Sequence, residues 1–294
     1  MRSFVTRRNR LDTPYTLWFL APAMAVYAVI FILPTFLAFF YSMTIWDLTN
    51  WRFVAFDNFR MFFAEPALYS SIGHTVIYAG LTTALKVVFS VLLAVLLTSG
   101  IRTKNLLRAI VLFPYMVSTL AIGLAFSALM HPTNGVLNQV IGFFGGAPVD
   151  WLGNPSIALY SIIFVDVWKG VGVATVVCIA GITSISREYY EAAAVDGASG
   201  LRRFTRITLP LMRPAINSVI ILAFVGGMRY FDLIWSMTKG GPGFATDVLA
   251  SIVYKQYAFG FYGLATAGNV VMFILIAALA FPLYRFLISK EADI

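Results

Sequence analysis

Six long runs of apolar residues divide the chain, and polar residues gather mainly in the segments between them. The runs cover residues 17–43, 73–97, 109–130, 158–182, 215–234 and 264–287. Each run is long enough to cross the hydrocarbon core of a bilayer, which takes about 20 residues of helix. Because backbone groups in hydrocarbon must find hydrogen bonds within their own segment, each run is predicted to be a helix. The pattern predicts an all-α integral membrane protein with six transmembrane helices.

Composition supports the same assignment. Hydrophobic residues make up 60% of the 294 positions, charged residues only 12%, and the mean hydropathy is +0.84. An ordinary soluble domain carries roughly a quarter charged residues, so this chain has too few to cover a water-soluble surface. The net charge of +8 does not indicate nucleic-acid binding, since the basic residues cluster beside the apolar runs, as membrane topology requires.

The lysines and arginines predict the orientation of the spans. With a cytoplasmic amino terminus, fourteen of the 21 basic residues lie on the cytoplasmic side and four lie outside. The cytoplasmic set is Arg2, Arg7, Arg8, Arg10, Arg102, Lys104, Arg108, Arg187, Arg202, Arg203, Arg206, Arg213, Arg285 and Lys290. Because positively charged segments stay in the cytoplasm, both termini are predicted to be cytoplasmic, as tails at residues 1–16 and 288–294.

Prolines inside the runs predict local irregularities. Pro22, Pro34 and Pro282 are expected to kink their helices, where neighbouring helices can satisfy the freed carbonyls. Pro114 is expected near the start of the third span, because a proline suits the first turn of a helix.

The cytoplasmic segment at residues 183–214 has a pattern of its own. Residues 186–195 favour a helix, because an acidic first turn suits the positive helix end and the alanines cost little entropy. Asp196-Gly197 then predicts a turn, with glycine free to adopt positive φ. A second helical piece is expected to end at Leu209-Pro210. The segment is therefore predicted to be a short helix–turn–helix on the cytoplasmic face.

From the residues alone, two roles remain open for this segment. Its alanines give a smooth side that another protein's groove could approach closely, with the Glu191 carboxylate projecting from it. Alternatively, the segment rests on the membrane, with Arg202, Arg203 and Arg206 on anionic lipid headgroups.

The same segment strongly resembles the EAA loop of permease subunits from binding-protein-dependent ABC importers. That loop reads Glu-Ala-Ala, three residues, Gly, and a spacer that ends in Ile-x-Leu-Pro. The matching positions here are Glu191, Ala192, Ala193, Gly197, Ile207, Leu209 and Pro210. Further stretches resemble the carbohydrate branch, of the maltose and glycerol-phosphate types: Asn58-Phe59, Asp150-Trp151-Leu152-Gly153, Val167-Trp168-Lys169-Gly170, Phe231-Asp232 and Thr238-Lys239-Gly240-Gly241-Pro242. The resemblance covers nearly the whole chain, from about Leu17 to the sixth run.

The resemblance implies a six-helix type I importer permease bundle in a bacterial or archaeal cytoplasmic membrane. The chain would form half of the translocation pore of an ATP-driven importer for a sugar, oligosaccharide or related polyol. Its partners would be a second homologous permease, two ATP-binding cassette ATPase subunits, an extracytoplasmic solute-binding protein and the bilayer. ATP and Mg would be bound by the ATPases, so this chain would be a non-catalytic subunit that binds no cofactor.

The resemblance also assigns a role to the 183–214 loop. It would be the coupling helix, inserted into a cleft of an ATPase subunit, with Glu191 paired to a basic group there and Gly197 setting the bend. The residues expected at this ATPase contact are Glu191, Ala192, Ala193, Asp196, Gly197, Arg202 and Arg203.

Charged residues inside the runs are costly in a bilayer and are therefore candidates for function. Asp166 and Lys169 are three residues apart on one helical face, which makes them candidates for an ion pair with a structural or a gating role. Arg229 and Asp232 repeat the arrangement on the fifth run. Lys86, midway along the second run, needs a carboxylate or a watery cavity that the sequence does not identify.

Uncharged residues complete the set of candidates for a substrate pathway. Related permeases place substrate contacts at the positions of Trp168, Gly170, Gly227 and Tyr230, and Asn269 is a further candidate. Aromatic rings suit stacking on a sugar, and glycines let a ligand approach the backbone. Packing between helices explains the same residues equally well, so both interpretations stay open.

Two other classes of function compete with the importer permease. A stand-alone secondary transporter predicts inverted repeats with broken helices, and no such repeat is visible. An intramembrane enzyme needs a nucleophile–base or metal constellation. His74 and His131 lie near span ends and predict no metal site, and Cys178 is expected to be a packing residue. The dipeptide Gly-Lys of a P-loop does not occur in the chain.

Overall fold

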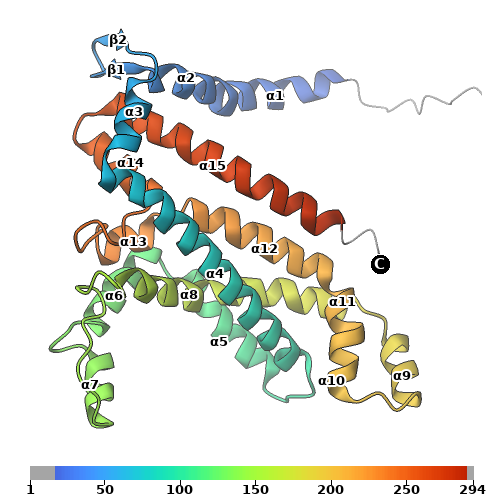
Figure 1. The fold of residues 1–294 in the computed structure, drawn as a ribbon. Coiled ribbons are helices and arrows are strands. Elements are labelled where there is room, and N and C mark those ends of the chain that lie inside the picture. Colours follow the sequence, from blue (N-terminus) through green and yellow to red (C-terminus); the bar gives the residue numbers. More distant parts are fainter. Residues whose placement is uncertain (1–16, 290–294) are drawn as a thin grey trace, which may run out of the picture.

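The computed structural model describes residues 17–289, which are mainly helical (Figure 1). Residues 1–16 and 290–294 lie outside the described residues, and with them Arg2, Arg7, Arg8, Arg10 and Lys290. The first half contains η1 (Leu17–Leu20), α1 (Ala21–Tyr27), η2 (Ala28–Ile32), α2 (Leu33–Ser42), β1 (Thr44–Trp46), β2 (Trp51–Phe53), α3 (Asp57–Ala64), α4 (Pro66–Thr98), α5 (Lys104–Met116), α6 (Thr119–Leu129) and α7 (Val136–Phe143). The second half contains α8 (Ala158–Thr183), α9 (Arg187–Val195), α10 (Gly200–Arg203), η3 (Phe204–Thr208), α11 (Leu209–Leu211), α12 (Arg213–Met228), α13 (Asp232–Met237), α14 (Leu249–Ala258) and α15 (Tyr262–Ser289).

Helices occupy all six predicted apolar runs. Four of them are long and apolar enough to cross a bilayer alone, namely Ala21–Ser42, α4, α8 and α15. Two more stretches qualify only as bent pairs: α5 with α6, at 96°, and Gly200–Leu211 with α12, at 64°. The 96° bend falls inside the third run, whereas the 64° bend, at Met212, precedes the fifth run.

The third run is broken in its middle. Val117 and Ser118 are extended between α5 and α6, with ψ of 142° and 133°. Pro114 lies inside α5, two residues before its end, so its prediction as a first-turn proline was wrong. A proline inside a helix removes one backbone hydrogen bond and crowds the preceding turn, so Pro114 weakens the last turns of α5.

The fifth run ends earlier than predicted. Its helix, α12, stops at Met228, and Arg229, Tyr230 and Phe231 separate it from α13. The last turn of α12 contains Gly226-Gly227, and each glycine costs about 1 kcal/mol relative to alanine in a helix. Gly226 and Gly227 therefore weaken the last turn of α12, and the helix ends just after them, before Arg229.

The centre of the fold is formed by α4, α8 and α12, which pack along one another (Figure 1). Because lipid is as apolar as the side chains, helices in a membrane associate through close packing at small residues. At Gly172, a β-carbon would lie 2.9 Å from Cα of Leu112, so this glycine lets α8 approach the backbone of α5. Cys178 is buried on α8 among Val91, Met212 and their neighbours, in the packing role that was predicted.

The first span lies apart from this centre. Helix α2 packs against α15, whereas α1 diverges from it, and both leave most of their apolar side chains exposed (Figure 1). The start of α1, the end of α15 and the α9–α11 segment all lie at the same end of the bundle (Figure 1). The opposite end carries the β1–β2 hairpin, α3, α7, α13 and α14.

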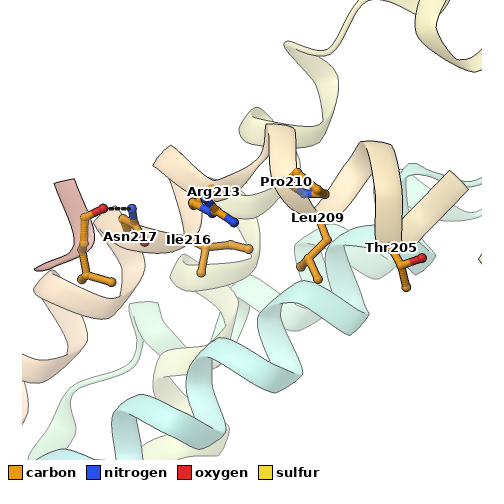
Figure 2. A pocket seen from close by; sticks show the side chains of 7 residues that line it. Thr205, Leu209, Pro210, Arg213, Ile216 and Asn217 are labelled. Atoms are coloured by element: carbon orange, nitrogen blue, oxygen red, sulfur yellow. Dashed lines mark hydrogen bonds between the residues drawn. The ribbon is translucent and has the colours of Figure 1, made fainter. Parts of the chain in front are cut away.

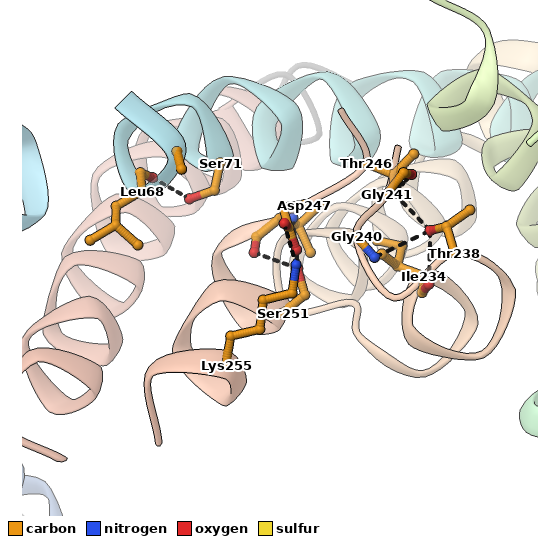
Figure 3. Close-up of polar contacts among 12 residues, drawn as sticks. Leu68, Ser71, Ile234, Thr238, Gly240, Gly241, Thr246, Asp247, Ser251 and Lys255 are labelled. Carbon is orange, nitrogen blue, oxygen red and sulfur yellow. Dashed lines mark hydrogen bonds and ion pairs between the residues drawn. The ribbon is translucent and has the colours of Figure 1, made fainter. Parts of the chain in front are cut away.

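A network of polar contacts fixes the loop between α13 and α14 (Figure 3). The Asp247 carboxylate is completely buried, accepts a hydrogen bond from Ser251 Oγ at 2.7 Å and pairs with Lys255 Nζ at 2.6 Å. The backbone carbonyl of Asp247 lies 2.9 Å from Nδ1 of His74, on α4. Because a buried carboxylate needs this many partners, Asp247 ties the loop to both α14 and α4.

Asp247→Asn is expected to destabilise the protein by about 2–3 kcal/mol, because it removes charged hydrogen bonds and leaves Lys255 without its partner. The measurement is the midpoint of thermal unfolding in detergent. Asp57→Asn is the matched control, since the Asp57–Arg60 pair is exposed and such pairs contribute little. Equal midpoints for the two variants would contradict a structural role for Asp247.

Candidate functional site

The predicted helix and turn of the 183–214 segment are both present. Helix α9 runs over Arg187–Val195, and Ser186 Oγ caps it by accepting a hydrogen bond from the backbone N–H of Glu188 at 3.4 Å. Gly197 has a φ of 71°, the left-handed conformation that the turn was predicted to need. Tyr190 Oη lies 3.0 Å from Oγ1 of Thr208, so the two arms of the helix–turn–helix are joined by a hydrogen bond.

The turn between α9 and α10, the tip of this segment, exposes large apolar side chains as well as the predicted alanines and carboxylate. Val195 is 88% exposed and Leu201 is 74% exposed, on either side of the turn. Glu191 and Ala192 are exposed on α9 as well, whereas Ala193 is half-buried. Asp196, Gly197 and Arg202 are exposed, and Arg203 is half-buried against the body of the protein. Exposed apolar side chains beside a carboxylate form a surface that suits a protein partner better than water.

The second arm runs further than predicted. It continues through α11 to Leu211 and bends at Met212 into α12, one residue past the predicted end at Leu209-Pro210. Pro210 lies near the end of this continuous arm, one residue before its last helical residue. The bend encloses a cavity of about 430 Å³, and Asn217 there donates a hydrogen bond to the carbonyl of Leu287 at 3.2 Å (Figure 2). The elbow thus connects the segment to α12 and to the end of α15.

A second cavity, of about 520 Å³, lies within the bundle where the third and fifth runs are broken. Six of the residues singled out from the sequence line it: Lys86, Asp166, Lys169, Gly170, Gly227 and Tyr230. The residues at the α5–α6 break, Met116 to Thr119, form another part of its wall. The interruptions in the helices therefore lie at the cavity that the candidate residues share.

The charged residues of the cavity pair differently from the prediction. Asp166, 2% exposed, pairs with Lys86 at 2.8 Å and not with Lys169. Lys169 donates a hydrogen bond to the carbonyl of Tyr115 at 3.3 Å, and its Nζ lies 5.0 Å from the centre of that tyrosine ring. The Lys86 side chain passes close to Gly170, where a β-carbon would lie 2.7 Å from Cε of Lys86. Lys86 on α4 thus reaches Asp166 on α8 beside this glycine.

The predicted pair of Arg229 and Asp232 is absent from the described residues. Both side chains are exposed, and they flank the break between α12 and α13. The prediction assumed one continuous helix, in which residues three apart share a face, and the break removes that geometry.

Two candidates for the substrate pathway lie outside the cavity. Trp168 is 42% exposed and packs against Phe126, with ring centres 5.1 Å apart. Asn269 is exposed on α15. Neither residue lines the cavity that contains Gly170 and Tyr230.

Packing explains part of what the remaining candidates do. A β-carbon at Gly227 would lie 2.8 Å from Cα of Ala79, so this glycine lets α12 approach α4. Tyr230 stacks on Tyr78, with ring centres 5.3 Å apart, while also lining the cavity. Sequence reasoning missed Tyr78 and Tyr115, which no motif distinguishes from other aromatic residues of the spans.

The histidines have structural contacts. His74 bonds to the backbone of Asp247, and Nδ1 of His131 lies within 3.3 Å of the backbone N–H groups of Thr133 and Asn134. Among residues 17–289, no three histidine, cysteine, aspartate or glutamate residues form a group that could hold a metal ion.

Comparison with known proteins gives consistent matches along the chain. Residues 86–291 match the family described as the inner membrane component of binding-protein-dependent transport systems. The trehalose/maltose transport system permease protein MalF of Thermococcus litoralis is 32% identical over 257 residues, 87% of either chain. The multiple sugar-binding transport system permease protein MsmF of Streptococcus mutans is 31% identical and covers 99% of this chain and 100% of its own.

A solved structure shares the fold. It is that of a bacterial alginate ABC transporter in complex with an alginate pentasaccharide-bound periplasmic protein. One of its chains superposes with a TM-score of 0.78 at 23% sequence identity, over 92% of either chain.

Proposed function

The chain belongs to the family of binding-protein-dependent transport system inner membrane components, and on this premise we propose that it is a permease subunit of an ATP-driven importer for a sugar, oligosaccharide or related polyol. The relatives named above are permeases for trehalose, maltose and multiple sugars, which supports the substrate class. As an inner membrane component, the chain is proposed to leave ATP hydrolysis to separate subunits.

The observation that carries the proposal is the α9–α10 helix–turn–helix. It exposes Glu191, Ala192, Val195 and Leu201 at one end of the bundle, and its elbow at Met212 leads directly into α12. A movement of the α9–α10 turn would therefore be transmitted through the bend at Met212 and along α12, whose last turn lines the membrane cavity. The ATPase contact is proposed to comprise Glu191, Ala192, Ala193, Asp196, Gly197 and Arg202. Arg203 differs from these residues because it lines a cavity beneath the segment.

The chain is proposed to cross the membrane six times, with the bent α5–α6 pair as the third span and α12 as the fifth. The segment at residues 183–214, called the coupling segment, shares one end of the bundle with the start of α1 and the end of α15 (Figure 1). The basic residues concentrate at that end, and positively charged segments stay in the cytoplasm. Both termini and the coupling segment are therefore proposed to be cytoplasmic.

A complete transporter is proposed to contain a second homologous permease, two ATPase subunits that bind ATP and Mg, and an extracytoplasmic solute-binding protein. The exposed apolar faces of α1 and α2 are consistent with contact to lipid and to a second permease. No cofactor is assigned to this chain.

Transport is proposed to follow alternating access. ATP binding closes the ATPases, the coupling segments move together, and the two permeases rock between inward-facing and outward-facing states. Docking of the loaded binding protein favours the same state as ATP, so both act on one equilibrium. Within this chain, Gly170 and Tyr230 are the substrate-pathway candidates that line the membrane cavity.

Affinity purification from membranes in mild detergent, followed by mass spectrometry, tests this proposal. We expect the tagged chain to recover a second permease and an ATPase with a P-loop. We also expect Glu191→Ala to lower the recovery of the ATPase, because it removes the carboxylate at the contact. A wild-type chain that purifies alone and moves solute in liposomes without ATP would instead identify a secondary transporter.

A further inference from the structure

A third cavity, of about 800 Å³, lies beneath the coupling segment, between it and the ends of α4 and α8. Its wall combines apolar residues, among them Val95, Ile182 and Phe204, with two arginines, Arg187 and Arg203. The apolar residues belong to the ends of membrane spans or to the segment that faces them. The arginines belong to α9 and α10. Hydroxyl groups, such as those of Thr98, Ser99 and Thr183, complete a mixed wall, and its two charged residues both come from the coupling segment.

The two arginines have no acidic partner. Neither aspartate nor glutamate lines the cavity, and within residues 17–289 neither arginine forms an ion pair. The Nε atom of Arg203 is buried and makes no hydrogen bond to the described residues. A buried donor without an acceptor is unfavourable, so the cavity is suited to a ligand with anionic oxygens. Two guanidinium groups match the geometry of a phosphate group particularly well.

We propose that this cavity binds an anionic phospholipid, with Arg203 and Arg187 on the phosphate and with Val95, Ile182 and Phe204 against the glycerol and upper acyl chains. Free phosphate would satisfy the arginines but would leave the apolar wall without a partner. Because the lipid contacts α4, α8 and both arms of the coupling segment, it braces that segment against the spans. The inference rests on the proposed function only in that the braced segment is the one that docks an ATPase.

Two neighbouring arginines, both expected at the ATPase contact, differ in their position relative to the cavity. Arg203 lines the cavity and is half-buried, whereas Arg202 is exposed and lies outside it. Arg202 therefore remains at the proposed ATPase contact, and Arg203 becomes a lipid ligand. The pair gives a matched control, since Arg202→Gln and Arg203→Gln remove the same charge from adjacent positions.

Native mass spectrometry of the transporter complex, purified from membranes in mild detergent, measures the bound lipid. We expect the wild type and Arg202→Gln to retain phosphatidylglycerol equally. The fraction of complexes with bound phosphatidylglycerol should fall about fivefold in Arg203→Gln, because each arginine near an anionic lipid raises the affinity for it by about that factor. It should fall further in the double variant Arg187→Gln, Arg203→Gln. Equal retention by Arg202→Gln and Arg203→Gln would overturn the proposal.

Reconstitution separates the lipid from other anions. ATP hydrolysis by the complex in phosphatidylcholine vesicles should rise when phosphatidylglycerol is included, and should not respond to inorganic phosphate. Stimulation by inorganic phosphate alone would identify a small-anion site and overturn the lipid assignment. An Arg203→Gln permease that no longer binds the ATPase but retains phosphatidylglycerol as the wild type does would assign Arg203 to the ATPase contact and overturn the proposal. Failure of the wild type to recover any ATPase would count against the proposed function and not against the lipid site.

Discussion

Asp166→Asn should destabilise the protein by about 3–5 kcal/mol, the usual cost of removing one partner from a buried ion pair. The variant leaves the Lys86 ammonium, whose side chain is only 12% exposed, without its carboxylate inside a membrane-spanning helix. Removing one partner leaves the other charge uncompensated, which is costly within a membrane span. The measurement is the midpoint of thermal unfolding in detergent, together with the yield of folded protein from membranes.

A double variant distinguishes the loss of a partner from the loss of the pair. Replacing Lys86 by methionine and Asp166 by leucine together removes both charges while keeping similar volume, and such replacements are often neutral. We expect the double variant to unfold near the wild-type midpoint. If it is as unstable as Asp166→Asn, the pair does not join α4 to α8 through its charges.

Gly197→Val should uncouple ATP hydrolysis from transport while the membrane bundle stays folded. Gly197 has a φ of 71°, and a β-branched residue held in that conformation costs about 1–3 kcal/mol. If the segment relaxes to avoid the strain, the tip no longer matches its partner, and the affinity for the ATPase should fall by about 5- to 150-fold. The measurements are the dissociation constant of the ATPase for the reconstituted permease and the rate of ATP-driven uptake.

The matched control for this variant is Gly197→Asn, at the same position. A β-carbon at Gly197 would meet no atom within 4 Å, so neither change is a steric clash. Asparagine adopts positive φ more readily than other residues with side chains, whereas valine resists it. We expect Gly197→Asn to bind the ATPase nearly normally. Equal losses in the two variants would show that the turn conformation of Gly197 is not what matters.

Local signals in the sequence were enough to predict the coupling segment. Its helix depends on alanines and a capping serine, and its turn depends on one glycine, so neighbouring residues determine both features. The apolar runs likewise placed the helices, because the length of a span is fixed by the thickness of the bilayer.

Features that depend on contacts between helices could not be predicted in the same way. Asp166 has Lys169 one turn away on its own helix, yet it pairs with Lys86, 80 positions earlier. That choice depends on how α4 crosses α8 at Gly170, which no local pattern encodes. The break after Pro114 did have a local signal, since a proline well inside a run disfavours a continuous helix. The prediction was wrong because it started the third run at residue 109. Helix α5 starts at Lys104, so Pro114 lies well inside it.

The central claim is that this chain moves solute only as part of an ATP-driven complex. The most direct measurement is uptake of radiolabelled disaccharides, oligosaccharides and sugar alcohols into proteoliposomes, with and without ATP, by the purified complex and by the chain alone. The account predicts uptake by the complex that requires both ATP and the binding protein, and no uptake by the chain alone. Uptake by the chain alone without ATP would contradict it.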